Sequence, residues 1–271
     1  MPEGDTVHKL AAYLSPLLTG RRLTLARIRN HPDAQLAGHR VTGVSSHGKH
    51  LFIQLDDGRV LRSHLGMRGS WHHYRAGETW EGPATRAAIE LQVGDEVLVC
   101  FNPKEVVLDH TGDAGRRPVP AHLGPDLLAD DVDADLLVER ARTLLDADTP
   151  LADVLLDQRV AAGIGNVYKS ETLFLMGIPP WQTLAQTPDE TLRVTYLEAA
   201  RLLRANARPG PRVTRRSADA TGILWVYGRK GQPCHRCGTP IRHARLGRHL
   251  RATYWCPRCQ ADSADGRTPG A

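Results

Sequence analysis

The sequence predicts an α+β protein of two domains, and three features of the 271-residue chain lead to this fold class. Short β-rich runs separated by Gly, Asp and Asn turns fill about residues 22–109, which is typical of an antiparallel sandwich. Segments with helical periodicity dominate from about residue 133 to 207. Four cysteines then follow, in two closely spaced pairs that flank a predicted β-hairpin. We therefore expect a β-sandwich domain first, and a helical domain with a cysteine-bearing hairpin second.

A long helix is expected near the N-terminus, flanking the sandwich. Asp5 or Thr6 is a suitable N-cap, and Pro16 and Gly20 are expected to end the helix. The apolar residues that recur at helical spacing are Val7, Leu10, Ala11, Leu14 and Leu17.

The remaining elements follow in order along the chain. The strands of the sandwich are expected in LTLARI, HLFIQL, RVLRSHL, AAIELQV and EVLVCF. The segment TGDAGRRPVPAHLGP is the best candidate for a hinge between the domains. Helices are predicted for DADLLVERARTLL, PLADVLLDQRV, NVYKSETLFLMGI and DETLRVTYLEAARLLRANA. The final residues, ADSADGRTPGA, are small and polar and are expected to be disordered.

Composition indicates an ordinary globular protein, with 41% hydrophobic and 24% charged residues. No apolar run approaches the roughly 20 residues that a membrane span needs. The N-terminus lacks the basic-then-apolar pattern of a secretory signal, so a cytoplasmic protein is expected. Five cysteines in that compartment argue against a disulfide framework.

Positive charge is concentrated in the C-terminal third. Between Arg201 and Arg251 there are thirteen Lys or Arg and one acid, Asp219, whereas residues 126–157 are rich in acids. Such a basic region predicts a polyanionic partner, with nucleic acid as the first choice. Charge alone is equally compatible with a solvated basic surface.

The cysteine pairs predict a metal site. Eighteen residues separate the two C-x2-C pairs, a spacing that suits one tetrahedral Zn²⁺. Four sulfur ligands leave no open position, so the ion is expected to be structural rather than catalytic. Cys100 lies in the apolar run EVLVCF and is expected to be a buried thiol. The predicted zinc ligands are Cys234, Cys237, Cys256 and Cys259.

The segment LLDQRVAAGIGNVYKSETLFLMGI is a second candidate site. A helix is expected to end near Val160, and Asn166 is expected to cap the next one. The glycines between them allow close approach of an anion to a helix N-terminus, which predicts phosphate binding. An ordinary capped helix in an αα-hairpin is the alternative.

Together these motifs resemble the formamidopyrimidine-DNA glycosylase/endonuclease VIII family of DNA repair enzymes. The resemblance covers nearly the whole chain, through MPEG, HGKHLF, HLGPDLLADD, GIGNVYKSE and YGRKGQPCHRCGTPI…RATYWCPRCQ. It implies a catalytic β-sandwich domain at 1–121, a hinge at 122–132, and a helix–two-turn–helix DNA-binding domain at 133–222. A zinc-finger hairpin at 223–260 and a tail at 261–271 complete the expected organisation.

The resemblance implies that Pro2, once Met1 is removed, is the nucleophile. An α-amino group titrates near 8 and a lysine near 10.4, so at pH 7 about 10% of the former is neutral against roughly 0.04% of the latter. Attack on C1′ of a damaged nucleotide would form a Schiff base, and β- and δ-elimination would follow. Glu3 is the adjacent acid–base, Lys49 assists catalysis at a phosphate, and Arg251 binds the phosphate that is eliminated.

Further DNA contacts are implied by the same resemblance. Asn166 matches a phosphate-binding asparagine, and Met67, in SHLGMRGSW, matches the residue that fills the space left by an extruded base. Lys104 is expected to touch phosphate. In CFNPKEVVLD, however, Glu105 and Val106 stand where the purine-lesion branch has arginine and phenylalanine, so its second wedge is missing.

These departures, with MPEG in place of MPEL, resemble the endonuclease VIII branch. We therefore expect oxidised pyrimidines and abasic sites as substrates, with an oxidised-purine enzyme as the alternative. A different class of protein, a non-catalytic nucleic-acid-binding zinc protein, would need the cysteines, Asn166 and Arg251 but not a free Pro2 beside Glu3. The expected partner is damaged DNA, bound by a monomer associated with the nucleoid.

Overall fold

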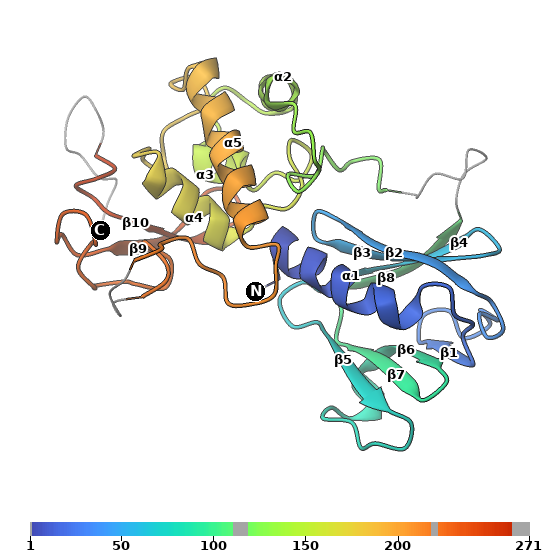
Figure 1. Cartoon of the computed structure of the whole chain (residues 1–271). Coiled ribbons are helices and arrows are strands. Elements are labelled where there is room, and N and C mark those ends of the chain that lie inside the picture. The colour runs from blue at the N-terminus through green and yellow to red at the C-terminus, as the bar shows by residue number, and fades with distance from the viewer. Residues whose placement is uncertain (1, 111–118, 218–221, 262–271) are drawn as a thin grey trace. The chain divides into compact units, whose positions relative to one another are not determined.

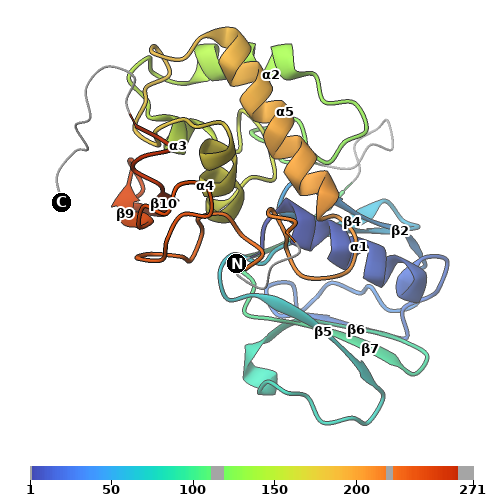
Figure 2. The same cartoon turned by 60° about the vertical axis from the view of Figure 1, so that its left-hand side comes forward.

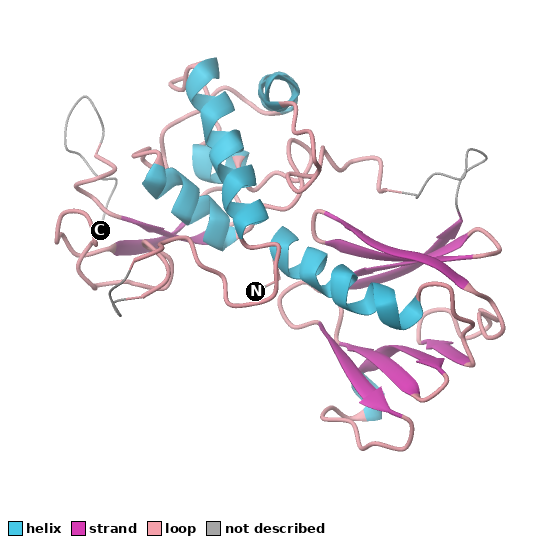
Figure 3. Ribbon diagram, viewed as in Figure 1, coloured by secondary structure: helices cyan, strands magenta, loops and turns pink. Residues whose placement is uncertain are grey.

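The computed structural model describes residues 2–110, 119–217 and 222–261. The chain divides into two compact units, Met1–Ala121 and His122–Ala271. Strands dominate the first unit and helices the second, as Figure 3 shows. The predicted α+β fold, with a β-sandwich followed by a helical domain and a hairpin, is confirmed. Among the described residues, no helix is long and apolar enough to span a membrane.

The N-terminal unit contains two four-stranded antiparallel sheets. One has the order β1-β6-β7-β5 and the other β2-β3-β4-β8. The strands are β1 (Leu25–Ile28), β2 (Val41–His47), β3 (His50–Leu55), β4 (Arg59–His64), β5 (Ser70–Arg75), β6 (Ala87–Val93), β7 (Glu96–Phe101) and β8 (Glu105–His110). The five expected strands are present. Strands β2, β5 and β8 were not expected, because Ser, His and Gly interrupt the apolar pattern of the first two and β8 has few buried residues.

Helix α1 (Gly4–Leu18) lies alongside the sheets and packs on β2 and β3 (Figure 1). Its buried apolar residues, Val7, Ala11, Leu14 and Leu18, join the sandwich core. The predicted caps were wrong, because Glu3 is the N-cap. Pro16 was also expected to end the helix but lies inside its last turn, where the missing N–H removes only one backbone hydrogen bond.

The sandwich core is continuous with α1 and includes Cys100, which has no exposed surface. Burial raises the pKa of this thiol, because the thiolate would lose its hydration. Cys100 is therefore a core residue, as expected. An η1 turn, Ala84–Arg86, precedes β6.

The C-terminal unit packs four helices around its own core. They are α2 (Ala134–Leu144), α3 (Leu151–Val154), α4 (Asn166–Leu175) and α5 (Asp189–Ala205). The sequence predicted that the second of these helices ends near Val160, but α3 ends at Val154. After Val154 the backbone makes a mixture of i+3 and i+4 hydrogen bonds, and the Asp157 carboxylate accepts the Arg159 backbone N–H at 2.9 Å, which favours a turn over a continued helix.

The expected hairpin is formed by β9 (Arg242–Leu246) and β10 (Arg251–Trp255). Both strands lie beside α4 in two views of the molecule (Figure 1 and Figure 2). An apolar cluster under the cysteines includes Phe174 of α4 and Val226, so the hairpin module packs onto that helix.

Residues 111–118 of the segment expected to form the hinge lie outside the described residues, and residues from 124 onward pack within the C-terminal unit. Leu127 is fully buried in the core of that unit. Its N–H donates to the Ala162 carbonyl at 3.2 Å, and the Ala162 N–H donates to the Pro125 carbonyl at 2.8 Å. The expected disordered tail lies, from residue 262 onward, outside the described residues.

Candidate functional site

The first candidate site is the start of α1. Pro2 is half-buried and directly precedes Glu3, which is fully buried. The Glu3 carbonyl accepts the N–H groups of Thr6 and Val7 at 3.0 and 3.2 Å, and its own N–H donates to Thr6 Oγ1 at 3.4 Å. The chain therefore enters the helix in one fixed direction, with Pro2 at the positive end of the helix dipole.

Thr6 stabilises the first turn of α1 through its side chain. Besides accepting the Glu3 N–H, its hydroxyl donates to Asp5 Oδ1 at 3.3 Å. The buried Asp5 also pairs with Lys9 at 3.4 Å, one helical turn away. These contacts hold the first turn that carries Pro2 and Glu3.

Two lysines, Lys49 and Lys104, lie near His64 in the same unit. Lys49 lies between β2 and β3, and Lys104 lies between β7 and β8, where its N–H donates to the His64 carbonyl at 2.8 Å. The pKa of His64 is lowered to about 4, first by burial and then by the charges of Lys104 and Lys49. The structure therefore brings Lys49 and Lys104 together around one neutral imidazole.

His64 is a candidate that the sequence did not reveal. Its Nδ1 is buried and has no hydrogen-bond partner among the described residues. Its ring lies 4.7 Å from the His50 ring, measured between centroids. A buried, unsatisfied nitrogen beside two lysines is a polar group that a ligand could bind. The only sequence signal was its place in SHLGMRGSW, directly before the Met67 loop.

Met67 lies on the loop between β4 and β5, and 72% of its surface is exposed. Two glycines shape this loop. A Cβ on Gly66 would approach Lys104 Cβ to 2.7 Å, and one on Gly69 would approach the Leu65 carbonyl oxygen to 2.4 Å. The tight loop presents Met67 to solvent, as a wedge residue requires, and its insertion into DNA stays a prediction.

In the C-terminal unit, Asn166 is the first residue of α4 and is 8% exposed. The N-cap is Gly165, so the predicted cap was one residue too late. The Gln158 side chain organises the preceding loop, because its Nε2 donates to the Ile164 carbonyl and its Oε1 accepts the Gly163 N–H, both at 3.1 Å. The Gln158 side chain thus holds the glycine-containing loop that leads into the N-terminus of α4. A glycine loop before a helix N-terminus is the arrangement expected of a phosphate site.

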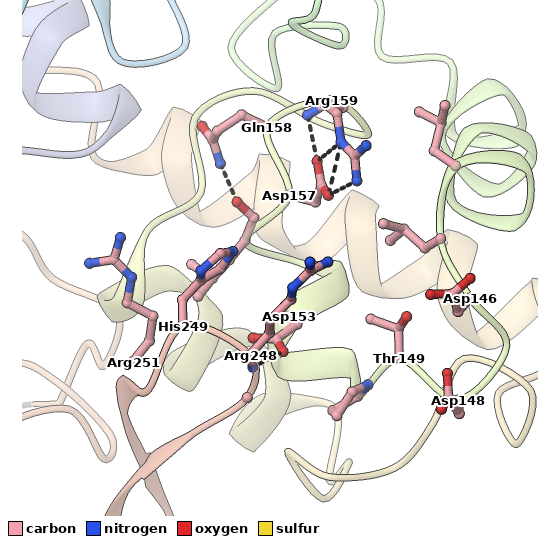
Figure 4. A pocket seen from close by; sticks show the side chains of 15 residues that line it. Asp146, Asp148, Thr149, Asp153, Asp157, Gln158, Arg159, Arg248, His249 and Arg251 are labelled. Carbon is pink, nitrogen blue, oxygen red and sulfur yellow. Dashed lines mark hydrogen bonds and ion pairs between the residues drawn. The ribbon is translucent and has the colours of Figure 1, made fainter.

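Arg251 is exposed at the start of β10, opposite Leu246. It lines a pocket of about 980 Å³ within this unit, together with residues of the hairpin turn and of the segment after α3. Figure 4 shows Arg251 and His249 from the hairpin, and Asp157 and Arg159 from the other segment. Asp157 and Arg159 are paired with each other at 2.7 Å.

The cysteines form the predicted metal site. The Sγ atom of Cys237 lies 3.4 Å from that of Cys256 and 3.5 Å from that of Cys259, and the Sγ atoms of Cys234 and Cys259 are 3.9 Å apart. Zn–S bonds of about 2.3 Å in tetrahedral geometry place sulfurs about 3.8 Å apart. All four Sγ atoms lie within 4.8 Å of one another, so this set fits one structural Zn²⁺.

Comparisons with known proteins agree with this arrangement. Three family models match in order: the formamidopyrimidine-DNA glycosylase N-terminal domain (1–105), its H2TH domain (123–216), and the zinc finger found in FPG and IleRS (231–261). The endonuclease 8 2 of Mycobacterium bovis is 41% identical over 96% of this chain and 100% of its own length. A DNA-(apurinic or apyrimidinic site) lyase Nei2 of Mycolicibacterium smegmatis is 40% identical over 97% and 100%.

A formamidopyrimidine-DNA glycosylase of Methylococcus capsulatus is 32% identical over 96% of this chain and 100% of its own length. Among solved structures, Lactococcus lactis formamidopyrimidine-DNA glycosylase, bound to DNA containing an abasic site, matches with a TM-score of 0.81. That match covers 96% of this chain and 100% of the other at 23% identity, and shows the common fold.

The fold, the zinc site and these matches define an enzyme that is a DNA glycosylase and an abasic-site lyase. The chain belongs to the formamidopyrimidine-DNA glycosylase/endonuclease VIII family.

We predict that Cys237→Ser will release zinc, because a hydroxyl is a poor substitute for a thiolate ligand. Zinc per chain, measured with a colorimetric chelator after denaturation, should fall from about one to well below one. Cys100→Ala removes a thiol outside the cluster and should retain full zinc. Equal zinc in wild type and Cys237→Ser would show that the cysteine assignment is wrong.

We also predict that His64 makes stability depend on pH. Its pKa is about 4 in the folded chain against 6.5 for an unperturbed histidine, so the unfolded chain takes up a proton at a higher pH than the folded chain does. The titration of His64 therefore leaves the free energy of unfolding unchanged above pH 6.5 and lowers it as the pH falls from 6.5 towards 4.

The measurement is urea unfolding at several pH values in wild type and His64→Gln. The wild-type free energy of unfolding, relative to the variant, should fall by about 2 kcal/mol across that window, less than full linkage because solvent reaches part of the ring. A constant difference between the two proteins would contradict a depressed pKa.

Proposed function

We propose that this enzyme excises oxidised bases from DNA, with pyrimidines preferred, and then cleaves the strand through a Schiff base on Pro2. The observation that carries the proposal is the placement of Pro2 directly before the buried Glu3, at the positive end of α1. That end of a helix disfavours a nearby ammonium and so favours the neutral, nucleophilic amine. The packing of α1 into the sandwich core gives the terminus a fixed position.

In the proposed reaction the Pro2 nitrogen attacks C1′ of the damaged nucleotide, and the bond from C1′ to the base breaks with its electrons on the base. The proton that the Pro2 nitrogen loses passes to the departing base, which leaves as a neutral molecule. Glu3 supplies a proton as the C1′–O4′ bond opens, which leaves an iminium on Pro2. Loss of a C2′ proton expels the 3′ phosphate, and a further proton loss expels the 5′ phosphate. Water then hydrolyses the iminium and frees Pro2.

Cationic groups in each unit support DNA as the partner. Lys49 and Lys104 carry charge beside His64 in the N-terminal unit, and Arg251 is exposed on the hairpin. Arginine suits a phosphate because its guanidinium donates two parallel hydrogen bonds. The M. smegmatis relative is named as a lyase of abasic sites, which agrees with this assignment.

The strand after the β7–β8 turn supports the pyrimidine branch. Val106 is 8% exposed and belongs to the sandwich core, so its side chain is engaged in packing. Glu105 accepts two hydrogen bonds from Arg62, at 3.1 and 3.2 Å. Neither residue offers the apolar wedge of the purine branch, and relatives named endonuclease 8 share more identity with this chain than the glycosylase of M. capsulatus does.

We predict that borohydride will trap wild-type protein on a duplex that contains an abasic site, because it reduces the iminium to a stable amine. Pro2→Gly, or a tag before Pro2, should reduce the trapped fraction at least about tenfold, since both remove the secondary amine. The same tag at the C-terminus is the matched control. Undiminished trapping of the N-terminally tagged chain would place the nucleophile elsewhere.

A second prediction concerns the damaged base. Single-turnover excision should be at least about tenfold faster on duplexes with dihydrouracil or thymine glycol than on a matched duplex with 8-oxoguanine. An undamaged duplex is the control. Faster excision of 8-oxoguanine would assign the chain to the oxidised-purine branch instead.

A further inference from the structure

Helix α4 carries three consecutive polar residues with no exposed surface, Lys169, Ser170 and Glu171. Ser170 Oγ accepts the N–H of Tyr254, in β10, at 3.3 Å. The Glu171 carboxylate accepts the backbone N–H groups of three consecutive residues, 225–227, at 2.7 to 2.9 Å. This polar row therefore joins α4 to two segments that lie far away in sequence.

Lys169 reaches the strand that carries Arg251. Its Nζ donates to the Ala252 carbonyl at 2.9 Å and to Thr253 Oγ1 at 2.7 Å. Thr253 Oγ1 in turn donates to the carbonyl of Arg251 at 3.1 Å. Lysine is almost never fully buried, and an ammonium in a protein interior is costly unless hydrogen bonds compensate for lost water. Here those bonds go to the two residues that directly follow Arg251.

The turn before Arg251 is held from the other side by Asp153 of α3. The Arg248 N–H donates to Asp153 Oδ2 at 2.7 Å. Gly247 has φ +74° and lies so close that a Cβ there would come within 2.0 Å of Asp153 Oδ1. Figure 4 shows Asp153 beside Arg248, in the turn that leads to His249 and Arg251.

We propose that Lys169 and Asp153 are positioning residues that hold Arg251 in its phosphate-binding orientation. The zinc site holds the end of the hairpin that carries the cysteines. Cys256, the zinc ligand nearest to Arg251 in the sequence, follows it by five residues. The turn and the first residues of β10 are held instead by the Asp153 carboxylate and the Lys169 ammonium. This inference rests on the proposed role of Arg251. It predicts that substitution of Lys169 or Asp153 weakens DNA binding only when Arg251 is present.

The test is equilibrium binding, by fluorescence anisotropy, to a duplex with a tetrahydrofuran abasic analogue. Lys169→Met is made in the wild-type background and in an Arg251→Ala background. With Arg251 present, the substitution should weaken binding about tenfold, whereas in the Arg251→Ala background it should weaken binding less than about twofold. Arg193→Met, which removes one charge from α5 outside the basic region between Arg201 and Arg251, should have little effect in either background. Zinc content and circular dichroism check that each variant is folded.

Asp153→Ala should show the same dependence on Arg251. Thr253→Val, which removes one acceptor of the Lys169 ammonium and keeps the side-chain shape, serves if Lys169→Met does not fold. Equal weakening in both backgrounds, or no weakening with Arg251 present, would overturn the proposal.

Failure of the proposed role of Arg251 would look different. In that case Arg251→Ala alone would bind as wild type. The contact of Lys169 with β10 is then tested by amide hydrogen exchange. The Thr253 and Tyr254 amides should exchange faster in Lys169→Met than in wild type. Unchanged exchange would show that Lys169 does not hold this strand.

Discussion

The carboxylate of Glu171 accepts backbone hydrogen bonds from Trp225, Val226 and Tyr227, and this buried contact governs the organisation of the C-terminal unit. An ionised side chain with no exposed surface is tolerated only when its acceptor capacity is filled. The loop at 225–227 must therefore be in place for α4 to be stable, and that loop leads directly into the first cysteine pair. Together with Lys169 and Ser170, the contact makes α4, the loop and the zinc hairpin one cooperative structure.

In the N-terminal unit, the packing of a helix holds the end of the chain in place. Terminal residues are normally poorly ordered unless they are tied down. Here α1 buries Val7, Ala11, Leu14 and Leu18 in the sandwich core, and the Glu3 and Thr6 pair fixes the first turn. The position of Pro2 is thus set by the packing of a 15-residue helix.

In the sandwich unit, Lys49 and Lys104 lie near a neutral histidine, whereas Glu105 is paired with an arginine. Lys49 and Lys104 share the neighbourhood of an imidazole that burial keeps neutral, so the histidine adds a polar group without adding positive charge. The carboxylate of Glu105 is instead engaged by Arg62, one strand away. Glu105 and Val106 are therefore both integrated into the sandwich, with Val106 packed in the core.

Much of the molecule was predictable from local pattern. Alternating and 3.6-residue periodicities indicated five strands of the sandwich and the five α-helices of the described residues, and the C-x2-C spacing identified all four zinc ligands. Spacing suffices there because each feature is specified by residues a few positions apart. Local errors arose where one residue competes with its neighbours, as at the Glu3 and Gly165 caps and at the end of α3.

The sequence by itself thus determined the fold class, the metal site and the family. Only the tertiary structure decided that His64 lies near two lysines, that Lys169 donates hydrogen bonds to β10, and that Gly247 lies against Asp153. Arg248 and Asp153 are 95 positions apart along the chain. No periodicity encodes such contacts, because they arise from the packing of elements that the sequence specifies separately.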